Sequence, residues 1–144
     1  MKDKIELDFK RWFRNHYPDW SEAYEPRHGG GVGIPDIQIL WKPDDMKLAT
    51  LIPIECKIGS IEIIKSGKVL KVKKVRASQV SWHYRFWRAG GVSKILVGVW
   101  DCYDVFWRIY ELPSIELWWD RPSRSFPLYQ LTEWHLGKGG KEDD

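Results

Sequence analysis

Cysteine is scarce in this chain of 144 residues: only Cys56 and Cys102 occur, and neither belongs to a CxxC pair or a cluster with histidine. The sequence therefore indicates neither a disulfide framework nor a zinc site, and it favours a reducing compartment. No run reaches the length of about 18 apolar residues that a membrane span requires, and the N-terminus lacks the apolar core of a signal peptide. These absences predict a soluble, intracellular protein of the cytoplasm, and leave a nucleoid-associated or phage-encoded protein open.

Repeats, low-complexity linkers and internal domain boundaries are also missing. We therefore expect a single domain over residues 1–136, followed by a polar, disordered tail over residues 137–144. The net charge is only +3, but positive residues crowd one stretch. Such crowding is typical either of a surface that binds a phosphate backbone or of a solvated hairpin whose lysines prevent aggregation. The residues concerned are Lys65, Lys68, Lys71, Lys73, Lys74 and Arg76.

Hydrophobic periodicity and turn residues predict alternating helices and strands. In chain order we expect a helix over 4–15, strands over 37–41 and 48–58, a hairpin over 61–75 turning at Ser66–Gly67, a helix over 78–89, and strands over 94–100 and 105–112. The segment from residue 113 onward, rich in Trp and Pro, receives no assignment. This order of elements predicts an α/β sandwich around a central mixed β-sheet flanked by helices.

Charged residues interrupt two of the apolar strands. Asp36 opens the first, and Glu55 and Lys57 lie within the second. By the period of two, Glu55 and Lys57 share one face of their strand, while Ile54 and Cys56 belong to the other. Removing such charges from water costs several kcal/mol, roughly, unless they are paired or bind a metal.

If the two strands are neighbours, Asp36, Glu55 and Lys57 converge. Two carboxylates a few ångströms apart are held ionised most readily by a hard divalent cation, and an oxygen-only ligand set suits Mg²⁺, with Mn²⁺ as a substitute. The main-chain carbonyl of Cys56 would supply another ligand. The Lys57 ammonium would orient an attacking water or stabilise charge on a phosphodiester, which predicts hydrolysis without a covalent intermediate. The alternative is an ordinary turn residue at Asp36 and a cross-strand ion pair of Glu55 with Lys57.

The arrangement Pro35-Asp36, eighteen intervening residues and Glu55-Cys56-Lys57 resembles the signature of the PD-(D/E)xK nuclease superfamily. Its surroundings resemble the VRR-NUC and archaeal Holliday junction resolvase branches, in which a glycine-rich approach, the acidic and lysine motifs, and a Gln on the following helix occur in this order. The stretches that carry the resemblance are RHGGGVGIPD (27–36), IPIECK (52–57) and ASQVSWHYRFWRAGGVSKILVG (77–98). Two features depart from the pattern: the long basic hairpin after Lys57 and the Trp-rich segment after residue 113.

The resemblance implies a restriction-endonuclease-like core and a role for each matching residue. Asp36 and Glu55 would be metal ligands, Lys57 the catalytic lysine, Gln79 the accessory residue, and Glu6 the acid contributed by the first helix. Gln79 also suits a helix cap, Glu6 also suits a surface acid near a helix start, and Glu22 and Glu25 compete for the role of Glu6.

We therefore expect a divalent-metal-dependent endodeoxyribonuclease that is selective for branched DNA or Holliday junctions and acts as a homodimer. The alternatives are a nuclease-fold protein that binds DNA without cutting it, and a restriction-type, RNA or single-strand nuclease. The residues expected to contact nucleic acid are Arg27, His28, Lys65, Lys71, Lys73 and Arg85.

Aromatic residues are plentiful, with ten tryptophans. Most are expected in the core, including Trp12, Trp82, Trp87, Trp100 and Trp107. Trp118 and Trp119 are expected at a partner surface. His83 and His135 are assigned no chemistry.

Overall fold

A computed structural model of the protein describes residues 4–16, 21–23, 33–35, 37–42, 47–73, 75–120 and 125–134. The described residues form two α-helices, two short 3-10 helices and eight strands. These are α1 (Lys4–His16), β1 (Ser21–Ala23), β2 (Ile37–Trp41), β3 (Thr50–Ile64), β4 (Gly67–Val72), α2 (Ala77–Arg88), β5 (Lys94–Asp101), β6 (Phe106–Glu111), η1 (Ile115–Leu117), β7 (Ser125–Pro127), η2 (Leu128–Gln130) and β8 (Thr132–Trp134).

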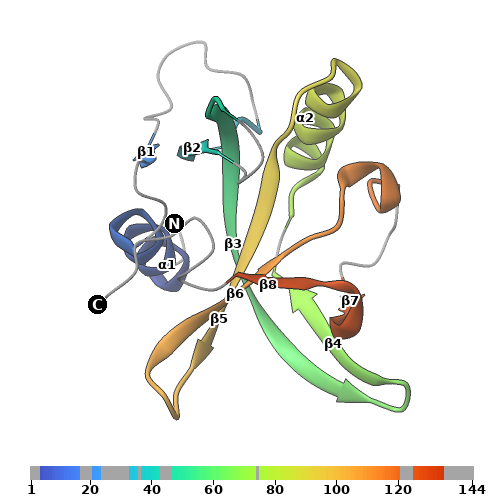
Figure 1. Ribbon diagram of the computed structural model, residues 1–144. Coiled ribbons are helices and arrows are strands. Elements are labelled where there is room, and N and C mark those ends of the chain that lie inside the picture. The colour runs from blue at the N-terminus through green and yellow to red at the C-terminus, as the bar shows by residue number, and fades with distance from the viewer. Residues whose placement is uncertain are drawn as a thin grey trace.

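Strand β3 is the central strand of a mixed sheet with the order β1-β2-β3-β5-β6-β8. It pairs antiparallel with β2 and parallel with β5, and its second half pairs antiparallel with β4, which in turn pairs with β7. Figure 1 shows β3 running through the centre of the molecule, with α1 and α2 apart from each other on either side of it. The expected α/β architecture with a central mixed sheet flanked by helices is confirmed.

The length of β3 differs from the expectation. The sequence predicted a strand over 48–58 and a separate hairpin strand, whereas one strand of 15 residues runs from Thr50 to Ile64. Gly59 does not end the strand, because β4 takes over as its neighbour there and Gly59 pairs with Val72. The hairpin turn consists of Lys65 and Ser66, one residue earlier than predicted.

The sheet separates two apolar clusters. Phe9 and Phe13 of α1 pack against Ile54, Cys56 and Ile58 on one face of β3. On the other face, α2 contributes Val80 to a second cluster, together with residues of β4, β5 and β6. The spacing of Phe9 and Phe13 by four residues places both rings on one side of α1, which explains why this helix packs flat on the sheet.

The segment after residue 113 completes both clusters. Trp118 is only 1% exposed, its ring packs edge-on against Phe126, and its indole N–H donates to the carbonyl of Pro113 at 2.8 Å. Trp134 belongs to the first cluster. The expectation of a partner surface is therefore wrong for Trp118, whereas Trp119 is 42% exposed and contacts Tyr84.

Two other tryptophans also differ from the expectation. Trp107 is buried, as predicted, but Trp87 and Trp100 are 38% and 47% exposed. Trp87 lies in the last turn of α2 against Tyr84, and Trp100 lies near the end of β5 against Trp107, so each ring covers the margin of a cluster and stays partly exposed. Periodicity alone does not show where an element projects beyond the core.

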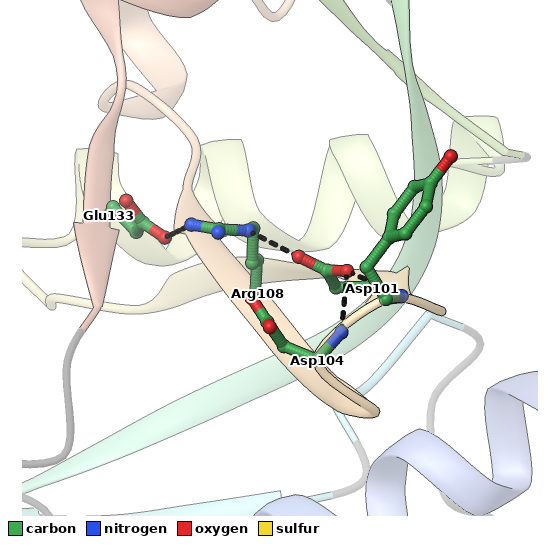
Figure 2. A network of polar contacts seen from close by, with 5 residues as sticks. Asp101, Asp104, Arg108 and Glu133 are labelled. Carbon is green, nitrogen blue, oxygen red and sulfur yellow. Dashed lines mark hydrogen bonds and ion pairs between the residues drawn. The ribbon is translucent and has the colours of Figure 1, made fainter.

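Asp101 fixes the turn between β5 and β6 through a polar network (Figure 2). Its Oδ1 accepts hydrogen bonds from the backbone N–H groups of Tyr103 and Asp104, and its Oδ2 accepts one from Arg108, which also donates to Glu133. The bond from Asp104 is the main reason that the pKa of Asp101 lies below its usual value. The network holds a turn in which Val105, a β-branched residue, adopts φ 55°, a strained conformation.

Candidate active site

A buried lysine lies between two carboxylates at the centre of β3. The Lys57 Nζ is 3.8 Å from Glu6 Oε1 and 3.9 Å from Glu55 Oε2. The side chains of Lys57 and Glu55 are 5% and 2% exposed, and that of Glu6 is 24% exposed. Both distances exceed the roughly 2.7–2.9 Å of a direct charged hydrogen bond, so the lysine is centred between the two acids and bonded tightly to neither.

The two acids reach Lys57 from different elements. Glu55 and Lys57 lie on the same face of β3, as the period of two predicted, and their register partners on β5 are Ile95 and Val97. Glu6 comes from the first turn of α1 and also forms an ion pair with Lys10 at 3.7 Å. The site therefore combines a strand and a helix that are about 50 residues apart in the sequence.

The strands that pair with β3 change at the positions of Glu55 and Lys57. Among the described residues, β2 pairs with β3 up to Ile54, and β4 begins to pair at Gly59. Between these points β5 is the neighbouring strand, on the opposite side of β3. This break in the ladder is where α1 brings Glu6 next to Lys57.

Asp36 lies outside the described residues, so the structure gives no distance between Asp36 and Glu55. The residues on either side of it in the sequence are described. Ile37, which follows it, pairs with Ile54, the residue before Glu55. Pro35, which precedes it, is buried.

Gly33, three residues before Asp36, packs closely against the start of α2. It has φ +89°, and a Cβ at this position would lie 2.3 Å from the carbonyl oxygen of Ser78. A side chain at residue 33 would therefore push this position away from α2. This contact brings the segment before Asp36 next to the helix that carries Gln79.

Gln79 caps the helix on which it lies. Its Oε1 accepts a hydrogen bond of 2.9 Å from the backbone N–H of Arg76, the N-cap residue of α2. The capping role, one of the two alternatives for this residue, is observed. An accessory role in catalysis is not tested and stays a prediction.

The side chain of Cys56 belongs to the opposite face of β3, where it is fully buried in the first apolar cluster. Its thiol therefore lies on the other side of β3 from the side chains of Glu55 and Lys57. The predicted contribution of its main-chain carbonyl to a metal site is not tested.

His83 is a buried neighbour of the site that sequence analysis assigned no chemistry. It is 1% exposed, and its Nδ1 shares a hydrogen bond of 2.6 Å with Ser93 Oγ. Burial, with a further contribution from the positive charge of Lys57, lowers the pKa of His83 to about 4. The imidazole is therefore neutral at pH 7. In the sequence, the burial of His83 is indicated by its spacing of three residues from Val80, which lies on the inner side of α2.

The residues expected to bind nucleic acid fall into three groups. Arg27 and His28 lie outside the described residues. Lys65, Lys71 and Lys73 are exposed on or beside the β3–β4 hairpin, and Lys71 forms an ion pair of 3.2 Å with Glu62. Arg85 is exposed on α2, where its Nε donates to the carbonyl of Ser81. These positions leave the prediction untested.

The chemistry of the acids fits a hard cation. Glu6 and Glu55 provide carboxylate oxygens on either side of the same ammonium group. Within the described residues, no group of three or more His, Cys, Asp or Glu side chains is arranged to hold a metal ion. The full ligand set expected from the sequence needs Asp36, which lies outside the part of the chain that the structure describes.

This chain matches no protein-family model, no curated protein and no solved structure. The resemblance to nucleases thus rests on the motif residues themselves. Of the helices in the described ranges, none has the length and apolar character needed to cross a membrane.

Proposed function

We propose that this protein is a divalent-metal-dependent endonuclease with a restriction-endonuclease-like core that hydrolyses phosphodiester bonds in DNA. The observation that carries the proposal is the buried Lys57 between Glu6 and Glu55. An ion pair of this kind contributes little to stability, because the cost of desolvating the charges offsets most of their attraction. Burying Glu55 and Lys57 at the centre of the sheet, with Glu6 beside them, is therefore better explained by chemistry than by folding.

In this proposal Asp36, Glu55 and Glu6 hold Mg²⁺, with the main-chain carbonyl of Cys56 as a further ligand. The metal, when bound, supplies activation of the attacking water and charge neutralisation at the phosphate. Mn²⁺ would substitute, because it accepts the same oxygen ligands.

Lys57 acts directly on the reacting groups. Its ammonium orients the attacking water or stabilises the negative charge that develops on the phosphate oxygens. Burial strengthens this effect, because the surrounding apolar residues keep water from screening the charge. Glu6 and Glu55 hold the flexible lysine side chain in place from two sides. Gln79 is the proposed accessory residue, and it lies at the start of α2, close to Gly33, where its oxygen caps the helix.

The substrate is proposed to be branched DNA, and the active form a homodimer. The proposed contacts to the DNA backbone are Arg27, His28, Lys65, Lys71, Lys73 and Arg85. Two-fold symmetry would let two copies of one small domain cut two strands symmetrically.

A cleavage assay tests the proposal. The purified protein is incubated with labelled four-way junction, flap, hairpin, single-stranded and linear duplex DNA, with Mg²⁺ and with EDTA. We expect metal-dependent cleavage that is fastest on the branched substrates, and no cleavage by Asp36→Asn. Glu62→Gln is the matched control, since Glu62 is an exposed acid farther along the same strand, and it should cleave like the wild type. Cleavage that persists in EDTA, or an active Asp36→Asn protein, would overturn the proposal.

A further inference from the structure

The β3–β4 hairpin continues beyond the apolar core and ends in a well-defined tip. Its register is regular up to the last pair, Ile64 with Gly67, and the turn contains Lys65 and Ser66. Gly67 has φ +127°, a conformation that favours glycine. Figure 1 shows the hairpin projecting from the body of the sheet, away from α2.

Two isoleucines at this tip are exposed. Ile63 is 81% exposed and Ile64 is 46% exposed. Nearer to the core, Ile61 and Leu70 of the same hairpin pack in the second apolar cluster. Apolar residues of the hairpin therefore continue beyond the cluster that stabilises the fold.

The tip also carries positive charge. Lys65 is in the turn, and Lys68 is directly opposite Ile63 in the register. Neither lysine has an ion-pair partner among the described residues, whereas Lys71 of the same strand pairs with Glu62. Since Ile63 and Ile64 are consecutive residues of β3, the tip presents one apolar side chain on each face of the hairpin, with Lys68 on the face of Ile63 and Lys65 in the turn.

We propose that this tip is a wedge for the branch point of DNA, formed by Ile63, Ile64, Lys65 and Lys68. The hairpin tip inserts between bases that have lost a stacking neighbour, with Ile63 against the base on one face and Ile64 against the base on the other, and the two lysines bind neighbouring phosphates. Apolar side chains such as isoleucine are used in this way to separate base steps, and lysines provide the accompanying backbone contacts. The inference rests on the proposed nuclease function and names the feature of the substrate that the protein reads.

The geometry also limits where cleavage occurs. Lys57 and Ile63 are six residues apart on one strand, which spans about 20 Å. This distance equals about six steps along one DNA strand. We therefore expect the cut within about six nucleotides of the branch point, and at a constant offset from it.

Binding of a four-way junction that carries 2-aminopurine at the branch point tests the wedge. The chain is used with Ca²⁺ in place of Mg²⁺ to suppress cleavage, and a linear duplex of the same sequence is the comparison. The double variant Ile63→Ser/Ile64→Ser should bind the junction at least about tenfold more weakly, as expected from the loss of buried apolar surface. It should also lose the fluorescence increase of the unstacked base, while its affinity for the duplex stays within about twofold of the wild type.

Leu48→Ser is the matched control, because Leu48 is 79% exposed at a position away from the hairpin, and it should behave like the wild type. Circular dichroism checks that all variants fold. Unchanged junction binding by the double variant would overturn the wedge. So would an equal loss on both DNA forms, a change in oligomeric state measured by sedimentation, or a loss of binding to anionic phosphatidylserine vesicles, since these would assign the tip to another partner. If the wild type binds no DNA at all, the proposed nuclease function fails as well.

Discussion

The two faces of strand β3 differ completely at neighbouring positions. Ile54 and Cys56 face α1 and are fully buried in an apolar cluster. Glu55 and Lys57, which alternate with them, face the other side and are buried as charged groups. One face therefore has the composition of a core that stabilises the fold, and the other face bears charges that folding alone does not require.

The difference separates the determinants of the fold from those of chemistry. Burying an isoleucine stabilises the folded state by roughly 1.5–3 kcal/mol, whereas a buried ion pair is often no more stable than apolar residues of the same volume. We infer that Ile54 and Cys56 are there for stability and that Glu55 and Lys57 are there for function. The predictions test this division by changing one face at a time.

The largest effect is expected from adjacent residues on opposite faces. Glu55→Gln should abolish cleavage, because it removes a negative charge from the metal site, and it should leave a folded protein that still binds DNA. Ile54→Ala should lower the free energy of unfolding by about 2–5 kcal/mol and preserve the cleavage rate of the molecules that remain folded. Urea denaturation and single-turnover cleavage measure the two quantities. A Glu55→Gln protein that keeps its cleavage activity and loses stability, or a folded Ile54→Ala protein that does not cleave, would contradict the division between the two faces.

Lys57→Met is expected to lower the single-turnover rate by about 10²-fold or more, the scale of losing one preorganised electrostatic contact. It keeps an unbranched side chain but leaves Glu6 and Glu55 without their shared cation. The variant should therefore be less stable than the wild type in EDTA, and Mg²⁺ should raise its melting temperature more than that of the wild type. Lys10→Met is the control, since Lys10 contacts the same Glu6 from α1. A full-rate Lys57→Met enzyme would reduce Lys57 to a structural ion-pair partner.

Because His83 is buried, we expect the stability of the protein to depend on pH. The pKa of His83 falls from 6.5 to about 4 on folding, mainly because it is buried. Between these two pKa values the unfolded chain binds a proton at His83 and the folded chain does not. The free energy of unfolding is therefore highest above pH 6.5 and falls as the pH drops toward 4. The loss amounts to about 3 kcal/mol over this range. Stability measured across the range should depend less steeply on pH in His83→Asn than in the wild type, and parallel curves would contradict the assignment.

The smallest effect is expected at an ion pair outside both faces. Lys71 and Glu62 form a salt bridge at 3.2 Å, with side chains 55% and 45% exposed. Exposed pairs of this kind contribute at most about 1 kcal/mol. Lys71→Gln should therefore leave the unfolding free energy almost unchanged and reduce the salt dependence of DNA binding by at most about one unit of slope. A larger loss of stability would show that the hairpin depends on this pair.

The strongly patterned part of the fold could be predicted from the sequence. The strand Ile37–Trp41 has the bounds that were expected, and the alternation from Ile52 to Ile58 assigned both faces of β3 correctly. Short strands with remote partners gave no such signal. The three residues of β7 pair with β4, and the three residues of β8 pair with β6, so their positions depend on tertiary contacts.

The candidate site was predictable to a similar extent. Periodicity placed Glu55 and Lys57 on one face, but the approach of Glu6 to Lys57 followed from the family resemblance, because no local pattern connects a helix to a strand so far along the chain. His83 had no local signal beyond helical spacing. Its importance depends on the packing of α2 over the sheet and on the contact with Ser93.

The central claim is that the charged face of β3 holds a divalent cation next to Lys57. Its most direct test is an anomalous difference map from crystals of the wild-type protein soaked in Mn²⁺. The account predicts a peak about 2.1 Å from a carboxylate oxygen of Glu55, the distance at which small, hard cations bind oxygen, with a carboxylate oxygen of Asp36 also in its coordination sphere. A map with Mn²⁺ bound elsewhere and no peak at Glu55 would contradict it.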